Sequence, residues 1–158
     1  MLDFLLPVIY IQLSPQRVTV RNVKSGEFLS EVPEVAISTA KPARVLDIGA
    51  AARLHSGANI VNPFAHPRSL VSDFTVGQML LKALVQRLLK RSFFVPSPKL
   101  VMHPLGEPEG GFTQIEIRVF REMALGAGAF SVIVWEGRAL SDQELLSGQF
   151  SGGGRVLA

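Results

Sequence analysis

The stretch from Lys90 to Lys99 constrains the fold most, because it joins an apolar helix to an apolar strand through a turn with two prolines. Before this turn, apolar residues recur at helical spacing, which predicts a helix over 76–90 with one buried stripe. After it, Pro96 and Pro98 cannot continue a helix and hold the chain extended, so 100–102 is expected to be a buried strand. The predicted stripe consists of Val76, Met79, Leu80, Ala83, Leu84 and Leu88.

The order of the remaining elements predicts an α/β fold, a mixed sheet with helices packed on it. Runs of apolar and alternating residues indicate strands, and longer apolar periodicities indicate helices. We expect one domain over 1–146 and a flexible tail over 147–158, where glycine and serine are frequent. Strands are expected at 8–13, 17–23, 34–38, 45–48 and 131–135, and helices at 50–55, 112–127 and 141–146, the last with Ser141 and Glu144 as a capping box.

The composition excludes several classes of site. The 158 residues include no cysteine, so neither a disulfide framework nor a thiolate metal site is available. The net charge is only +3, and its densest cluster, Arg87, Lys90 and Arg91, lies at a helix C-terminus, where cations favour the helix dipole. The apolar start over 2–13 is too short to span a bilayer. No metal site is expected, and the three histidines have no catalytic spacing, which predicts surface or packing roles for His55, His66 and His103.

Several motifs resemble MreB, the bacterial actin-like family that organises rod shape. The turn from Lys90 to Pro98 resembles its K-R-S-F-x-x-P-S-P motif, and Asn59 to Val61 resembles part of G-N-I-V. Leu70 to Phe74 is similar to V-I-A-D-F, and Ala127 to Ala129 to A-G-A. The similarity covers about Val8 to Glu136. It implies an RNase H-like half of the actin fold, the first lobe, and a role in the cell-shape cytoskeleton.

The phosphate loop of this family is degenerate in the chain. MreB relatives begin with D-L-G-T, whose amides cradle phosphate and whose aspartate helps to hold Mg²⁺, whereas this chain reads Gln12-Leu13-Ser14-Pro15. Gln12 supplies no carboxylate for a hard cation. Ser14 replaces a flexible glycine, and Pro15 removes an N–H donor. We therefore expect no bound cofactor at these nucleotide-binding positions; ATP and Mg²⁺ would be used only if the family activity survives.

Glu116 is the candidate catalytic residue, because the resemblance places the family's water-activating glutamate there. The residues themselves favour another role. Thr113-x-x-Glu116 is also a capping box, in which threonine and glutamate exchange hydrogen bonds with the first turn of a helix. We prefer the cap. Together with the degenerate loop, it predicts a chain without independent ATPase activity.

The chain contains no second phosphate loop of the D-I-G-G-G-T type, and the six residues 106–111 replace a shorter loop near the expected nucleotide cleft. The leading hypothesis is an MreB-like protein of the cell-shape machinery that acts through protein contacts. Its expected partner is an MreB-type filament or the missing second lobe, with no nucleic acid. It is expected in the cytoplasm, with peripheral contact at the inner face of the membrane. The alternatives are half of an actin-like ATPase completed by a second chain, and an unrelated small α/β binding module.

Overall fold

The computed structural model describes residues 5–66, 68–90, 95–106, 108 and 110–158. The first four residues and Arg91 to Phe94, which belong to the predicted proline turn, lie outside this part of the chain. In chain order the elements are β1 (Val8–Leu13), β2 (Val18–Asn22), β3 (Phe28–Glu31), β4 (Val35–Ile37), β5 (Val45–Ile48), the 3₁₀ helix η2 (Gly49–Leu54), β6 (Asn59–Val61), α1 (Phe74–Leu89), β7 (Lys99–Pro104), α2 (Gln114–Gly126), β8 (Ser131–Gly137), α3 (Asp142–Ser147) and β9 (Gly154–Val156).

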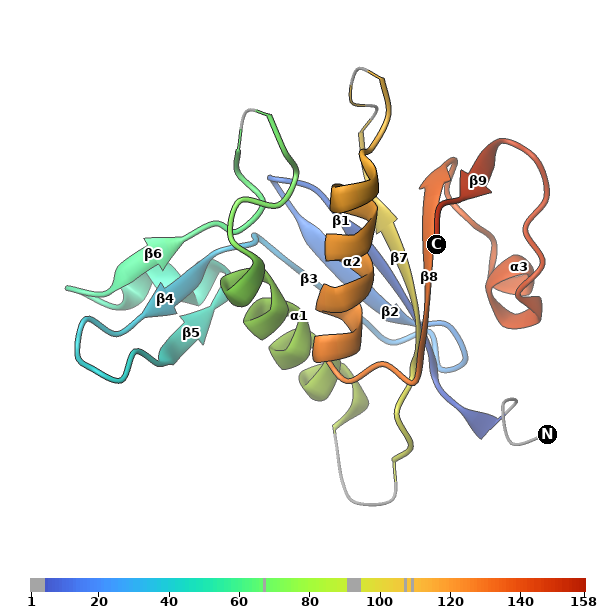
Figure 1. Ribbon diagram of the computed structural model, residues 1–158. Helices are drawn as coiled ribbons and strands as arrows, with labels where there is room; N and C mark the ends of the chain where they lie inside the picture. The colour runs from blue at the N-terminus through green and yellow to red at the C-terminus, as the bar shows by residue number, and fades with distance from the viewer. Residues whose placement is uncertain (1–4, 67, 91–94, 107, 109) are drawn as a thin grey trace.

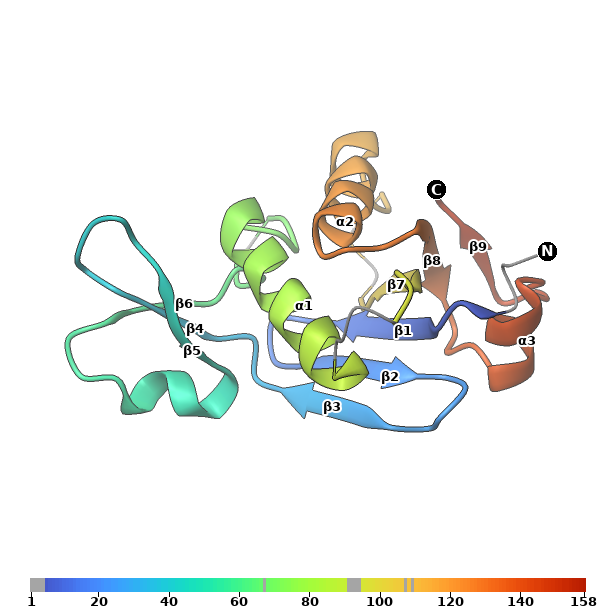
Figure 2. The ribbon, with the colours of Figure 1, turned by 90° about the horizontal axis from the view of Figure 1, so that it is seen from below.

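Six strands form one mixed sheet in the order β3-β2-β1-β7-β8-β9, and α1 and α2 lie together on one of its faces (Figure 1). β1, β7 and β8 are parallel to one another, whereas β2, β3 and β9 are antiparallel to their neighbours. The predicted α/β fold with a mixed sheet is confirmed. A three-stranded sheet in the order β5-β4-β6 lies beside the main one (Figure 2).

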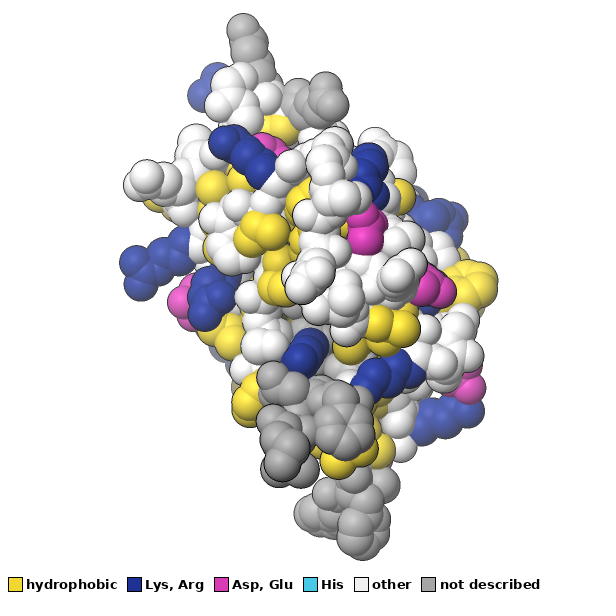
Figure 3. Space-filling view, turned by 90° about the vertical axis from the view of Figure 1, so that its right-hand side faces the viewer, with side chains coloured by type: hydrophobic (Ala, Val, Ile, Leu, Met, Phe, Trp, Pro, Cys, Tyr) yellow, Lys and Arg dark blue, Asp and Glu magenta, His cyan; other side chains and the backbone are white. Residues whose placement is uncertain are grey.

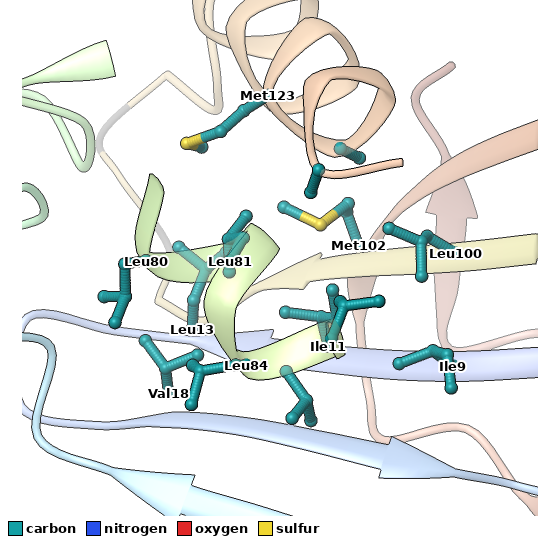
Figure 4. Packing of buried hydrophobic residues seen from close by; sticks show 14 of the residues in the cluster. Ile9, Ile11, Leu13, Val18, Leu80, Leu81, Leu84, Leu100, Met102 and Met123 are labelled. Atoms are coloured by element: carbon teal, nitrogen blue, oxygen red, sulfur yellow. The ribbon is translucent and has the colours of Figure 1, made fainter. Parts of the chain in front are cut away.

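The central strand β1 separates two apolar layers. Its side chains alternate, as strand geometry requires. Ile9, Ile11 and Leu13 join the core beneath α1 and α2, whereas Val8 and Tyr10 join a smaller cluster on the opposite face (Figure 4). On that second face, Leu145 of α3 and Phe150 pack against Trp135 and the neighbouring strands, and the rest of the cluster is Val23, Val101, Ile133 and Leu140.

Helix α1 follows its predicted pattern at most positions. The Asp73 carboxylate accepts the N–H of Val76 at 3.0 Å and caps the first turn. Val76, Leu80, Leu84 and Leu88 are buried, as the stripe predicts. Met79 is an exception, because 39% of it is exposed. The buried face of the helix extends instead towards Gly77, Leu81 and Val85, which leaves Met79 on the opposite, exposed flank. Within the described ranges, no helix combines the length and the apolar character needed to cross a bilayer.

The segment from 147 to 158, for which the sequence predicts flexibility, contains strand β9. Arg155 pairs with Glu136 of β8, and the amide of Leu157 donates to the carbonyl of Val134 at 2.7 Å. Glycine makes this pairing feasible. A Cβ at Gly154 would collide with the carbonyl oxygen of Glu136 and the ring of Trp135. The glycines thus permit a close approach of two backbones, besides allowing the chain more conformations. The flexibility of the segment stays a prediction.

Candidate functional site

The β1–β2 turn, where the family resemblance places a phosphate loop, is closed by its own serine. The Ser14 hydroxyl oxygen accepts the N–H groups of Gln16 at 3.3 Å and of Arg17 at 3.1 Å. The Ser14 amide donates to the carbonyl of Arg17 at 2.9 Å. Pro15 has no N–H, and its carbonyl accepts the side-chain amide of Asn62 at 2.8 Å. The amides that a phosphate loop would turn towards its ligand are therefore engaged within the turn.

The predicted cofactor-binding residues do not fit ATP with Mg²⁺. Gln12 offers a neutral amide where a hard cation favours a carboxylate. Leu13 is fully buried in the core beneath the helices, and Ser14 is committed to its own turn. Among the described residues, no group of three histidine, aspartate or glutamate side chains is placed to hold a metal ion. Gln12 and Leu13 end β1 and Ser14 begins the turn, and the loss of phosphate binding at these positions stays a prediction.

Glu116 lies in the first turn of α2. Its carboxylate accepts the N–H of Thr113 at 2.8 Å, and the Thr113 hydroxyl oxygen accepts the N–H of Glu116 at 3.1 Å. Both hydrogen bonds of a capping box are thus present. These two hydrogen bonds explain why a threonine and a glutamate stand at these positions without any need for a ligand. Activation of water by Glu116 stays a prediction.

A pocket of about 480 Å³ opens at the edge where β7 and β8 end. Neither Gln12, Ser14 nor Glu116 lines it. The sequence indicated a changed loop over 106–111, and Gly106, Pro108 and Gly111 of this loop supply part of the wall. The sequence did not indicate the wall contributed by β9, because this wall depends on the pairing of β9 with β8, which joins residues far apart in the chain. The lining residues are His103, Pro104, Leu105, Gly106, Pro108, Gly111, Glu136, Gly137, Gly154 and Arg155.

A buried series of hydrogen bonds fixes the floor of the pocket. The carbonyl of Gly137 can only accept, so Nε2 of His103 carries the proton and donates to it at 2.9 Å. Nδ1 of His103 then accepts the Tyr10 hydroxyl at 2.6 Å, and the Tyr10 oxygen accepts the N–H of Leu140 at 3.2 Å. Burial lowers the pKa of His103 and raises that of Tyr10. The packing role predicted for His103 agrees with these contacts.

Arg138 ties the C-terminal segment to the end of β8. Its Nε donates to the carbonyl of Gly152 at 2.6 Å, and its Nη2 donates to the Ser151 hydroxyl at 2.8 Å. Its guanidinium also pairs with Glu144, which holds the pKa of that carboxyl far below its ordinary value; the amide of Ser141 adds to the effect. These bonds place β9, and with it Arg155, along the pocket.

No protein-family model matches the chain. Over 68 residues it is 38% identical to the cell shape-determining protein MreB of Escherichia coli (strain K12), a match that spans 42% of the chain and 18% of that relative. The crystal structure of MreB5 of Spiroplasma citri bound to ADP superposes over 83% of the chain with a TM-score of 0.64 and 20% identity. The chain is MreB-like and forms part of one lobe.

Other proteins extend the comparison. A non-polymerising mutant of MamK bound to AMPPNP matches the MreB-like chain over 82% of its length, with a TM-score of 0.65 and 15% identity. The chain covers 38% of the MreB5 structure and 40% of the MamK structure, so it spans well under half of either protein. The uncharacterized protein YjaA of Escherichia coli (strain K12) is 29% identical over 125 residues, which are 76% of each chain. The fold is that of an actin-like lobe.

Proposed function

We propose that this MreB-like chain serves the cell-shape cytoskeleton through protein contacts and does not hydrolyse nucleotide by itself. The observation that carries the proposal is the self-closed turn after β1. The Ser14 hydroxyl oxygen accepts hydrogen bonds from the N–H groups of Gln16 and Arg17, and Pro15 has no N–H group to donate. The backbone amides of Ser14, Gln16 and Arg17 are therefore already engaged and are not free to bind a phosphate group. The similarity to a cell shape-determining protein supports the cellular process.

Calorimetry with ATP and Mg²⁺ tests the nucleotide part of the proposal. We expect no measurable heat of binding from the chain, and a dissociation constant in the micromolar range would contradict the proposal. A triple variant, Gln12→Asp with Ser14→Gly and Pro15→Thr, restores the D-L-G-T motif and is compared with the parent chain. If loop chemistry is the cause, the variant should bind more tightly than the parent.

The main alternative, half of an ATPase completed by a second chain, makes a different prediction. A phosphate-release assay would be run on the chain alone and mixed with a separately produced second lobe of MreB. Two variants distinguish catalysis by Glu116 from capping of α2. Glu116→Gln removes the candidate catalytic base, whereas Thr113→Ala disturbs the cap and leaves the carboxylate of Glu116 in place. Release that occurs in the mixture and is lost only in Glu116→Gln would refute the non-hydrolysing function.

The proposed partner is an MreB-type filament or a second lobe, and the proposed location is the cytoplasm, at the inner face of the membrane. The solved relatives are actin-like, and the chain has the fold of only part of one such protein, which supports a protein partner. Co-sedimentation with MreB filaments should carry the chain into the pellet. Recovery in the supernatant at every filament concentration would contradict the filament partner, and a fluorescent fusion would test the location.

A further inference from the structure

The pocket at the end of β7 and β8 has the form of a small-molecule site. Its volume of about 480 Å³ lies in the usual range for ligand pockets, and its position outside the carboxyl ends of parallel strands is where α/β sheets commonly bind ligands. Pro104, Leu105 and Pro108 give it an apolar wall. Figure 3 shows the side of the molecule that carries α3 and β9, where charged side chains of both signs are interspersed with apolar ones.

One acidic and one basic side chain stand together in the lining. Glu136 and Arg155 are register partners on β8 and β9, and Nε of Arg155 donates to one carboxylate oxygen of Glu136. The Arg155 side chain is 67% exposed and that of Glu136 22%. Arg155 reaches the opposite wall, since a Cβ at Gly111 would lie 3.7 Å from its Nη2. The paired Nη groups of Arg155 have no partner among the described residues, nor has the second oxygen of Glu136.

These free groups define the charge of a suitable ligand. The outer edge of a guanidinium binds a carboxylate through two parallel N–H bonds. The free oxygen of Glu136 accepts from an ammonium group. Because the two side chains together carry no net charge, the pocket offers a polyanion one attractive and one repulsive contact, whereas a zwitterion gains from both. His103 adds no charge, since the geometry fixes its neutral form.

We propose that this pocket binds a free α-amino acid with an apolar side chain. Its carboxylate lies on the Nη edge of Arg155, its ammonium on Glu136, and its side chain against Pro104 and Leu105. The inference goes beyond the proposed function, because it needs neither the β1–β2 turn nor a filament partner.

An NMR titration of the full chain tests the site. The probes are L-phenylalanine, hydrocinnamate, which keeps the ring and the carboxylate, and phenethylamine, which keeps the ring and the ammonium. We expect L-phenylalanine to bind most tightly and to shift the amides of Gly106, Gly111 and Gly137, with hydrocinnamate weaker and phenethylamine weakest. ATP with Mg²⁺ is titrated separately, and its result tests the proposed function and not this pocket.

Two variants give the proposal a specific signature. Arg155→Gln should raise the dissociation constant for L-phenylalanine and for hydrocinnamate about tenfold or more, the usual effect of losing hydrogen bonds between charged groups. Glu136→Gln should weaken L-phenylalanine and leave hydrocinnamate as tight or tighter. Arg118→Gln is the matched control, because Arg118 is an exposed cation on α2 outside the pocket, and it should bind as the parent does.

Three results would overturn the inference. The first is the absence of shifts at millimolar L-phenylalanine in the parent. The second is equal binding of phenethylamine and L-phenylalanine, which would mean that Arg155 holds no carboxylate. The third is unchanged selectivity among the probes in Glu136→Gln. If Arg155→Gln releases β9, seen as loss of the hydrogen bond between Leu157 and Val134, Glu136→Gln alone decides the outcome.

Discussion

Leu84 provides a direct test of how the lobe is held together. It lies in the middle of α1, has no exposed surface, and belongs to the core that includes Ile11, Leu13 and Val18 from the sheet (Figure 4). Interiors are packed too densely for neighbours to fill a lost side chain without shifting backbone. Replacing Leu84 with alanine should therefore leave a cavity between α1 and the strands.

The cost can be worked from the removed atoms. Leu84→Ala deletes three carbons that water does not reach, which forfeits about 2.4 kcal/mol at about 0.8 kcal/mol for each buried methylene-sized group. The unfilled cavity adds to this loss, so we expect a decrease of about 3–4 kcal/mol in the free energy of unfolding, within the roughly 2–5 kcal/mol found for such changes. This is a large share of the stability of an ordinary domain.

Urea denaturation, followed by circular dichroism, measures the change. Met79→Ala is the matched control, since Met79 is on the same helix and 39% exposed, and it should cost less than about 1 kcal/mol. The urea dependence of the free energy should be the same in parent and variants. If Leu84→Ala costs under about 1 kcal/mol, or no more than Met79→Ala, the stripe does not hold the helix on the sheet.

Four further substitutions have defined outcomes. Thr113→Ala should lower the free energy of unfolding by about 1 kcal/mol, the usual loss for an N-cap, whereas Glu116→Gln should be mild because an amide oxygen can still accept the N–H; thermal melts compare them. His103 keeps a lowered pKa when folded, so the unfolded chain takes up its proton first as the pH falls. Stability should be full above about pH 6.5 and decline below it, and a His103→Gln variant should lose this slope in urea titrations at several pH values. Gly154→Ala should detach β9, seen as faster hydrogen exchange at Leu157, and unchanged exchange would contradict the close approach to β8.

Local signals in the sequence predicted the fold well. The strand from Val8 to Leu13 and that from Val45 to Ile48 have their predicted bounds. The helix after Ser141 has its predicted capping box, because both partners lie within one turn of chain. Met79 shows the limit of periodicity. Spacing locates the apolar side of a helix, but which flank of that side is buried depends on the elements packed against it, and here Gly77, Leu81 and Val85 are buried in place of Met79.

Features that depend on distant residues could not be predicted in this way. Tyr10 and His103 meet only because β1 pairs with β7, and nothing in either local sequence indicates the contact. The strand β9 is short and glycine-rich, and its conformation is set by pairing with β8 and not by its own propensity. The candidate pocket shares this dependence, since Glu136 and Arg155 become neighbours only after that pairing.

The late position of β9 has a consequence for synthesis on the ribosome. The central strand β1 is made first, but its parallel partner β7 begins at Lys99, and the edge of β8 is paired only by residues from Gly154 onward. A growing chain therefore carries the β1–β2–β3 hairpins with one apolar face uncovered until the helices and β7 have emerged. During that interval the nascent chain depends on slow, long-range pairing and exposes strand edges, the condition in which chaperone binding competes best with aggregation.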